Sequence, residues 1–190
     1  MPLSDPAPRR LLHLRDIELR GYLRDDGLFD IEARLTDTKS YAFSNQDRGE
    51  ITPGTPLHGM LARMTIDRDM LIHAFEASTE FGPYFACPSA AGNFSDLAGL
   101  SIGRGFVKAA NERIGGIKGC THLRELLGQM GTVAFQTTYV VRQDKAAAPN
   151  ALENPTRPAL LNSCLAYADG GEIARRTWPA YYAGTEQRGE

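Results

Sequence analysis

Two stretches of alternating residues flank a turn signal near the start of the chain. The first runs from Leu14 and places Arg15, Ile17, Leu19, Gly21 and Leu23 on one face, with Asp16, Glu18, Arg20 and Tyr22 on the other. Asp25-Asp26-Gly27 is a turn signal. The second stretch places Phe29, Ile31, Ala33 and Leu35 on one face. Since a period of two is the spacing of a half-buried strand, the pattern predicts an antiparallel hairpin.

More strands are expected before the pattern changes. Residues 60–67 alternate again and predict a third strand, and Met70 to Ala77 favours a fourth strand, with a short helix as the alternative. Beyond Phe81-Gly82-Pro83, helical spacing predicts helices over residues 93–97, over 104–114 and from Thr121 to about Tyr139. Strands followed by helices predict an α+β fold, in which helices from the C-terminal half pack on an antiparallel sheet.

The remaining segments carry weaker signals. Residues 44–56 are rich in Gly, Pro, Asn and Asp and predict a loop, while Gly128 and Gly131 suggest close packing of the last long helix against another backbone. A short helix is expected from Pro158 to Cys164 and a small hairpin from Ala166 to Arg175. We expect a single domain over 1–190, with 1–12 and 183–190 loosely held.

Charge and hydropathy exclude several classes of protein. The 190 residues carry a formal net charge of -2 with scattered basic residues, so there is no electrostatic case for binding nucleic acid or an anionic membrane. No apolar run reaches membrane-spanning length, and the N-terminus lacks the apolar core of a signal peptide. We therefore expect a cytoplasmic protein. In a reducing compartment its three cysteines favour a metal ligand or a nucleophile over disulfides.

The Cys120-Thr121-His122 step is the first candidate site. A thiol just before a helix N-terminus faces unpaired backbone N–H groups, which favour the thiolate. Both side chains could ligate a metal, or His122 could act as the base for Cys120 as a nucleophile. A structural role, with Cys120 as a small buried apolar residue and His122 at the surface, stays open.

Two more residues extend this group. Cys87 lies in the loop between strands and helices, and His58 lies where a loop meets a strand. With Cys120 and His122 they form a two-Cys, two-His set, which zinc or iron could accept, although the spacing is not that of a zinc finger. Cys164 could substitute as a ligand or belong to a helix core.

Asp37 and Lys39 end the second strand and share a side of it. Asp37 could accept a proton or orient a metal-bound histidine, and Lys39 could anchor a substrate carboxylate. A solvated turn pair is the alternative for both residues.

Part of the chain resembles the U-type iron–sulfur scaffold proteins. The resemblance is carried by M-L-A-R-M-T-I-D, F-A-C-P-S-A-A, L-A-G-L-S-I-G, G-C-T-H-L-R-E-L-L and A-F-Q, between about Pro56 and Gln136. It implies a similar fold, with Cys87 and Cys120 at ligand positions. The sequence departs from the pattern, because no cysteine lies near His58, and Gly119 stands where the family has its histidine. Exchange of a thiolate for imidazole suits one metal ion better than a cluster.

The whole chain also resembles a bacterial family of proteins of unknown function, domain of unknown function 2889. The residues that carry this likeness are R-D-D-G-L-F-D-I-E-A-R-L-T-D-T-K, P-L-H-G-M, C-P and G-C-T-H-L. The resemblance implies no established activity. Its members tend to accompany catabolism of aromatic or acyl compounds, which favours a small-molecule substrate.

These observations lead us to expect a metal-dependent small-molecule enzyme of lyase or hydrolase type, with mononuclear zinc or iron. The alternatives are an iron–sulfur cluster or metal carrier without catalysis, a metal-free cysteine enzyme, and a structural zinc site. Glycine-rich nucleotide motifs, H-E-x-x-H and G-x-S-x-G are missing from the sequence. A sheet with one uncovered edge could pair into a homodimer.

Overall fold

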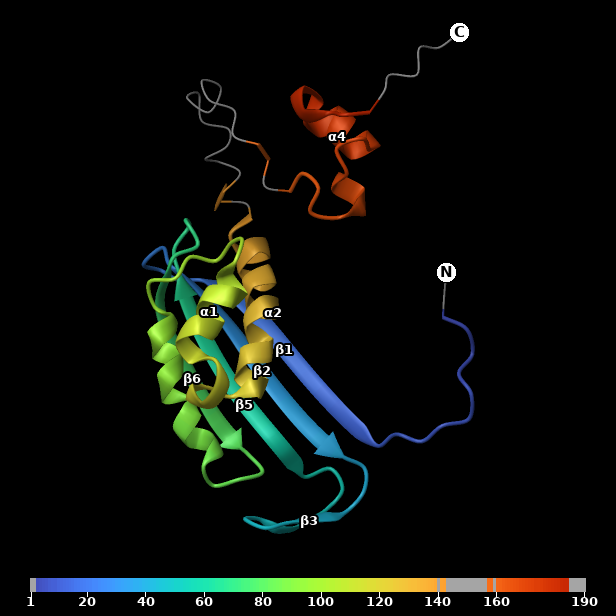
Figure 1. Ribbon diagram of the computed structural model, residues 1–190, viewed down its shortest axis with the longest axis vertical. Coiled ribbons are helices and arrows are strands. Elements are labelled where there is room, and N and C mark those ends of the chain that lie inside the picture. The colour runs from blue at the N-terminus through green and yellow to red at the C-terminus, as the bar shows by residue number, and fades with distance from the viewer. Residues whose placement is uncertain (1–2, 140, 143–156, 159, 185–190) are drawn as a thin grey trace. The chain divides into compact units, whose positions relative to one another are not determined.

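The computed structural model describes residues 3–139, 141–142, 157–158 and 160–184, and Figure 1 shows their helices and strands. The chain divides into two compact units, Met1–Gln143 and Asp144–Glu190. Each unit is described by itself, and the expectation of a single domain stays a prediction. Residues 3–12 carry no helix or strand, and residues 185–190 lie outside the described part of the chain.

The first unit is built on one antiparallel sheet. Its strands follow the order β1-β2-β5-β6. They are β1 (His13–Leu23), β2 (Phe29–Lys39), β5 (Pro56–Ile66) and β6 (Ile72–Phe81). The predicted hairpin is confirmed, because β1 pairs with β2 from Leu23↔Phe29 to His13↔Lys39 without a register shift. The fourth strand is also confirmed.

The loop predicted over residues 44–56 was only partly right. It contains a small second sheet, formed by β3 (Phe43–Asn45) and β4 (Gly49–Ile51). The Asn45 side chain accepts hydrogen bonds from the backbone N–H groups of Asp47 and Arg48, which closes the turn between the two short strands. The turn residues were recognised, but the strands are too short to show alternation.

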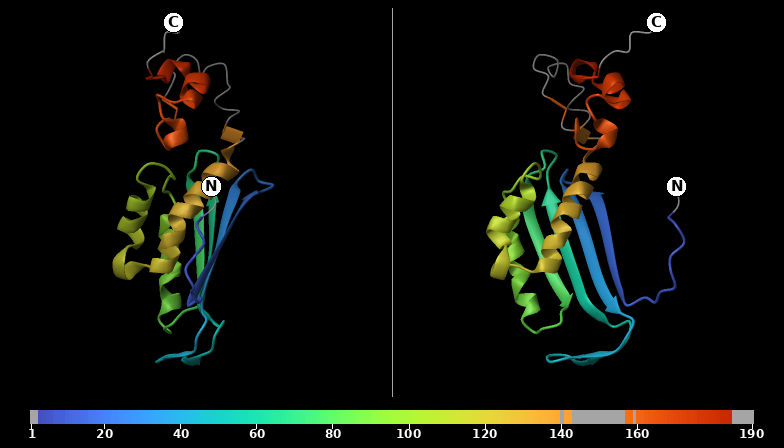
Figure 2. Two further views of the ribbon diagram at one scale, coloured as in Figure 1. Left: turned by 90° about the vertical axis from the view of Figure 1, so that its right-hand side faces the viewer. Right: turned by 45° about the vertical axis from the view of Figure 1, so that its right-hand side comes forward.

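Helices cover one face of the four-stranded sheet, as the turned views of Figure 2 show. They are η1 (Cys87–Ala90), η2 (Gly92–Leu97), α1 (Phe106–Ile114), η3 (Gly116–Lys118) and α2 (Thr121–Thr137). The α+β class is therefore confirmed. The expected helix over 93–97 is a 3-10 helix, and Cys120 occupies the N-cap position of α2.

The core lies between the sheet and these helices. The odd-numbered residues of β2 from Phe29 to Leu35 are buried, as are Leu123, Leu126, Leu127, Met130 and Ala134 of α2. Burying these apolar side chains supplies the main stabilising free energy of the unit. It also fixes which face of every strand points at α2.

The two α2 glycines behave differently. A Cβ added at Gly131 would lie 3.4 Å from a side-chain carbon of Ile102, whereas one added at Gly128 would meet nothing within 4 Å. Gly131 therefore packs against side chains and Gly128 against nothing within this distance, so the predicted close packing against another backbone was wrong for both glycines. The close approach of α2 to the sheet occurs instead at Gly21 of β1, where an added Cβ would lie 1.8 Å from Thr137 Oγ1.

The described part of the second unit is small. It holds η5 (Leu165–Tyr167), α4 (Glu172–Thr177) and η6 (Pro179–Tyr181), with Leu161 and Ala174 buried. The helix expected up to Cys164 was wrong, since residues 160–164 form turns and bends. The hairpin expected over 166–175 was also wrong. Asp169-Gly170 does form a turn, but the segment after it is the helix α4, which Glu172 opens with its favourable acidic charge.

The same substitution at two glycines should have opposite effects on stability. Gly21→Ala forces α2 away from β1 and should lower the free energy of unfolding by about 1–3 kcal/mol. Gly128→Ala has room for its methyl group and removes the backbone freedom of a helical glycine. This substitution should therefore raise the free energy of unfolding by about 0.5–1 kcal/mol. Urea unfolding of the two variants beside the wild type measures both changes, and equal changes would contradict this packing.

Candidate metal centre

Asp37 is a carboxylate on the apolar face of the sheet. Side chains alternate along β2, so Asp37 follows Phe29, Ile31, Ala33 and Leu35 on the buried face, and only 2% of it is exposed. A buried charge is costly unless it is paired and hydrogen-bonded. Its partners therefore define the site.

The sheet register supplies these partners. Arg15 on β1 and His58 on β5 lie directly opposite Asp37 on its two sides. The pairing of β2 with β5 shifts register just after Asp37, between Asp37 and Thr38, and such irregularities often lie beside functional sites. The first turn of α2 adds His122 from above the sheet.

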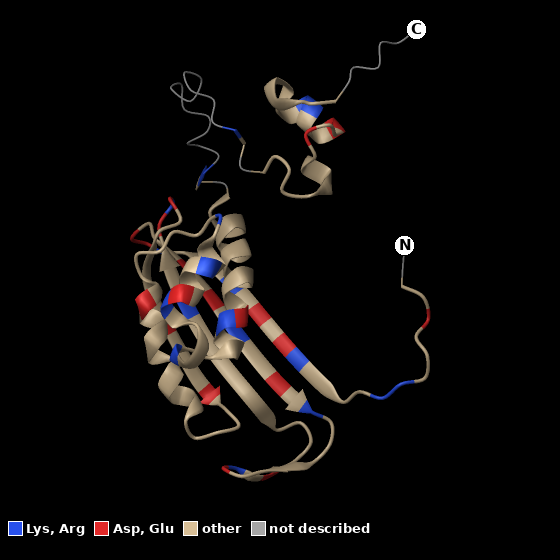
Figure 3. Ribbon diagram, in the orientation of Figure 1, with Lys and Arg blue, Asp and Glu red and all other residues tan. Residues whose placement is uncertain are grey.

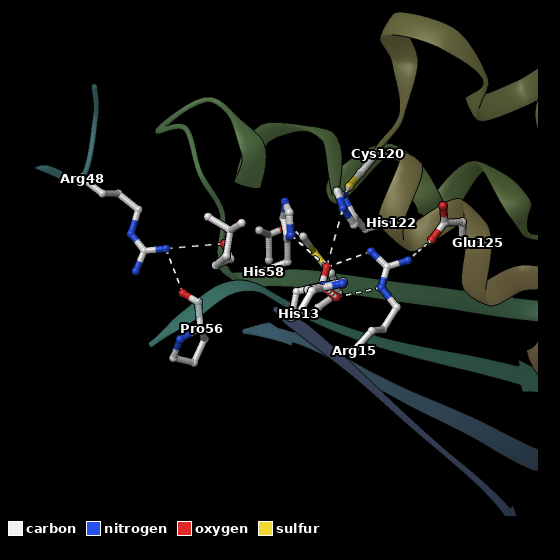
Figure 4. Close-up of polar contacts among 12 residues, drawn as sticks. His13, Arg15, Arg48, Pro56, His58, Cys120, His122 and Glu125 are labelled. Atoms are coloured by element: carbon white, nitrogen blue, oxygen red, sulfur yellow. Dashed lines mark hydrogen bonds and ion pairs between the residues drawn. The ribbon is translucent and has the colours of Figure 1, made fainter. Parts of the chain in front are cut away.

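Four hydrogen bonds converge on the carboxylate of Asp37. Oδ1 accepts from Arg15 Nε at 2.7 Å and pairs with His13 Nε2 at 3.0 Å. Oδ2 accepts from Arg15 Nη2 at 2.8 Å and pairs with His58 Nδ1 at 2.9 Å. In Figure 4 the side chains of His13, Arg15, His58 and His122 point toward one another from the sheet and the helix. The two bonds from Arg15 form a bidentate pair, which is the strongest carboxylate contact available to a side chain.

These contacts determine the ionisation of Asp37. Burial alone would raise the pKa of this carboxyl, but the hydrogen bonds and charge of Arg15, together with His13 and His58, lower the pKa to about 2. An ionised carboxylate can only accept hydrogen bonds. His58 Nδ1 and His13 Nε2 must therefore carry the hydrogens of these contacts, and the lone pair of a neutral His58 ring lies on Nε2.

The imidazoles of His58 and His122 are stacked. Their ring centroids are 3.7 Å apart, with the planes inclined by 29°. Burial lowers the pKa of both histidines, and the charge of the neighbouring ring for His58 and of Arg15 for His122 adds to this. Neutral imidazole is the form that ligates a metal or accepts a proton. The environment thus keeps both rings in the chemically useful state.

Arg15 also connects the sheet to α2. Its Nη1 donates to Glu125 Oε2 at 2.5 Å, while its other donors bind Asp37. The hydrogen bonds to Asp37 raise the pKa of the guanidinium, so it stays charged. Because Glu125 lies one turn after His122, this bridge fixes the height of the helix N-terminus over the sheet.

Asp37, His58 and His122 form a group that could hold a metal ion. Each offers a ligand atom, and these atoms lie within 4.8 Å of one another. His122 Nε2 is 3.9 Å from Asp37 Oδ2. Two imidazole nitrogens and one carboxylate oxygen are donors accepted by zinc and by non-haem iron.

The carboxylate is nevertheless fully engaged. Its two oxygens offer about four lone-pair positions, and the four contacts occupy them. A metal ion must therefore replace one contact. The bond between His58 Nδ1 and Asp37 Oδ2 is the natural one. Its 2.9 Å length need grow only to the roughly 3.0–3.4 Å that separates neighbouring ligand atoms in octahedral or tetrahedral coordination with bonds of about 2.1 Å.

Three of the four predicted metal ligands lie close together. The rings of His58 and His122 are stacked, and Cys120 lies beside them with Sγ 3.9 Å from His122 Nδ1. Cys87 opens η1 and packs against Gly82, and it is outside the group formed by Asp37 and the two histidines. Cys164 is exposed and belongs to the second unit.

Of the three residues predicted to be catalytic, Asp37 and His122 lie in this group. Lys39 ends β2 opposite His13, and its Nζ lies 6.0 Å from the centre of the Tyr41 ring. The catalytic roles of all three stay predictions.

Sequence reasoning missed His13, Arg15 and Glu125. Arg15 was assigned to a strand face but not to the site. A signal was available, because the Asp25-Asp26-Gly27 turn sets the hairpin register and places Arg15 opposite Asp37 on the otherwise apolar face. For Glu125 no such signal exists, since its contact depends on where α2 lies over the sheet.

A family model described as a protein of unknown function (DUF2889) matches residues 13–136. The chain belongs to this family. The DUF2889 match runs from the start of β1 to Gln136 of α2. It therefore includes every residue of the Asp37 cluster, which consists of Asp37 and its partners His13, Arg15, His58 and His122, with Glu125 bound to Arg15. Neither a search of the curated proteins nor one of the solved structures found a match. The likeness to iron–sulfur scaffold proteins stays a prediction.

Within the described residues, no helix has both the length and the apolar character needed to cross a membrane.

Acid should destabilise the metal-free protein through Asp37. Its carboxyl has a pKa of about 2 in the folded chain against 3.8 for the ordinary group, so the unfolded chain binds the proton first as pH falls. The stabilisation is complete above about pH 4, and about 2 kcal/mol is lost as pH falls to about 2. Urea unfolding across this range should show that loss in the wild type and a smaller one in Asp37→Asn. Equal pH dependence in both proteins would contradict the assignment.

Proposed function

We propose that this protein is a metal-dependent enzyme acting on a small molecule, with one zinc or iron ion held by Asp37, His58 and His122. The observation that carries the proposal is the convergence of these ligand atoms from β2, β5 and α2 within 4.8 Å. Side chains brought together from three elements are held by the fold itself, which favours a pre-organised site.

The arrangement around the group supports this proposal. Arg15 and His13 hold the carboxylate ionised and oriented, as outer partners do for metal ligands. Both histidines are neutral at neutral pH, because burial lowers their pKa values. Metal binding would then move the His58 proton from Nδ1 to Nε2 without leaving an unpaired charge.

The donor set suggests the type of reaction. Three protein ligands leave positions on zinc or iron for water or substrate, as in catalytic sites of this kind. There the ion would polarise a carbonyl or activate water, which suits a hydrolase or a lyase. A small-molecule substrate, of the aromatic or acyl class, is the partner we expect.

Metal affinity tests the ligand set directly. Isothermal titration of the chelator-treated protein with Zn²⁺ or, without oxygen, Fe²⁺ should give about one ion per chain. His58→Ala and His122→Ala each remove a ligand, so both should weaken binding by more than the roughly 10–100-fold typical of an outer partner. The matched control is His73→Ala, because His73 forms its own pair with Asp67 at 2.9 Å and is not in the group. If His73→Ala weakens binding as much as the other two, the ligand assignment is wrong.

A cysteine-based enzyme is the second candidate, favoured by one further observation. Cys120 Sγ, His122 and Asp37 follow one another with separations of 3.9 Å at each step. A nucleophile, a base and an orienting carboxylate have this order in covalent catalysis. Distances of this length are loose, and they would have to shorten on substrate binding.

Alkylation separates the two candidates. Once a substrate has been found by screening, iodoacetamide on Cys120 should leave metal binding intact and reduce turnover only modestly if the metal performs the chemistry. Cys120→Ala should behave the same way, and Cys87→Ala serves as the matched control. Complete loss of turnover in Cys120→Ala with full metal content would favour the nucleophile instead.

A further inference from the structure

The two edge strands of the sheet, β1 and β6, differ in how well they are protected from pairing with another strand. At β6, the pairing with β5 contains two register shifts, and the segment near Ser101 covers the strand start. Ile72 N donates to Leu100 O at 2.9 Å, and Gly99 N donates to Ile72 O at 2.8 Å. Bulges and covering segments are common means by which proteins block a sheet edge from pairing.

The β1 edge lacks these protections. Its pairing with β2 runs over the whole strand without a shift. No strand of the described residues pairs with its other side. The strand contains no proline, and Leu14, Tyr22 and Leu23 are exposed by 43%, 41% and 66%. A long, regular and partly apolar edge is a template for another strand.

The charged and apolar side chains of β1 are complementary to those of a second β1 strand that runs antiparallel to it. When two copies run antiparallel around a two-fold axis at Glu18, Asp16 faces Arg20 of the second copy and Leu14 faces Tyr22. On the inner face Ile17 meets Leu19. Acid thus lies opposite base and apolar opposite apolar, each twice by symmetry. Figure 3 shows both signs of charge along this strand.

The neighbouring registers match less well. An axis at Ile17 would place Asp16 against Glu18, two like charges. An axis at Leu19 would pair Glu18 with Arg20, but it would leave Asp16 against Tyr22 and Ile17 against Gly21, so the apolar pairs are lost. Like charges directly opposite one another destabilise a sheet. With the axis at Glu18, the two Glu18 side chains face each other, but each already forms an ion pair with Arg20 of its own strand.

We propose that the protein is a homodimer in which the β1 strands of two copies pair antiparallel around Glu18 and join the two sheets into one. The interface strand is also the strand that carries His13 and Arg15, whose side chains are 40% and 31% exposed. In this register Arg15 faces Gly21 of the second copy, which has no side chain of its own. His13 faces the exposed Leu23, so pairing shields the Asp37 cluster from water on that side.

A charge exchange tests the register. Sedimentation of the intact protein from about 1 to about 100 µM should give twice the 20.8 kDa of one chain. Asp16→Arg and Arg20→Asp each create two like-charge contacts and should weaken dimerisation by roughly 10-fold or more. The double variant with both substitutions restores opposite charges and should restore the dimer. Glu76→Arg on the β6 edge is the matched control and should leave it unchanged.

A chain that stays at 20.8 kDa throughout this range, or a dimer that ignores both single reversals, would overturn the proposal. Failure of the double variant to recover would overturn the register.

Cysteine crosslinking provides an independent measurement, because only the residue on the axis faces its own copy. Glu18→Cys should crosslink between chains far more than Ile17→Cys or Leu19→Cys, each compared with the wild type. Preferred crosslinking at either neighbour would reject the register around Glu18. The dimer does not depend on the metal, so these results and those of the metal titration are separable.

Discussion

The bidentate pair between Arg15 and Asp37 is the interaction on which the site depends. It allows a carboxylate to remain ionised on the apolar face of the sheet, where burial alone would favour protonation. The ionised carboxylate in turn fixes the tautomers of His13 and His58. Removing Arg15 would leave an uncompensated buried charge, and such a loss costs far more than the net worth of the pair. The pair is therefore a requirement of the fold as well as of the site.

The position of α2 follows from the same residue. Arg15 reaches Glu125 on the helix, and the Gly21 backbone lets the far end of the helix approach β1 closely. Apolar burial supplies most of the free energy that holds α2 on the sheet. The contact between Arg15 and Glu125 adds little to this free energy. Its effect is to determine the position of His122 relative to His58. A metal centre assembled from a sheet and a helix needs such a contact.

Much of the fold could be predicted from local patterns. The hairpin, the strand order along the chain and the long helix follow from periodicity and turn residues, which are local signals. The site was harder. His58, His122 and Asp37 were each singled out from the sequence, but Cys87 was grouped with them on residue type alone, and Asp37 was assigned a catalytic or orienting role instead of a ligand position. Residue type alone does not show which side chains lie close together in the fold, and the structure places Cys87 against Gly82 instead. The β1 partners were accessible through hairpin register, whereas the Glu125 contact required the tertiary position of α2.

X-ray absorption on the zinc-loaded protein tests the central claim most directly. The ligand set of Asp37, His58 and His122 predicts a first shell of nitrogen and oxygen at about 2.0–2.2 Å with the multiple-scattering signature of two imidazoles. A sulfur neighbour at about 2.3 Å would place Cys120 or another cysteine on the metal and contradict the account. So would a spectrum with no imidazole contribution.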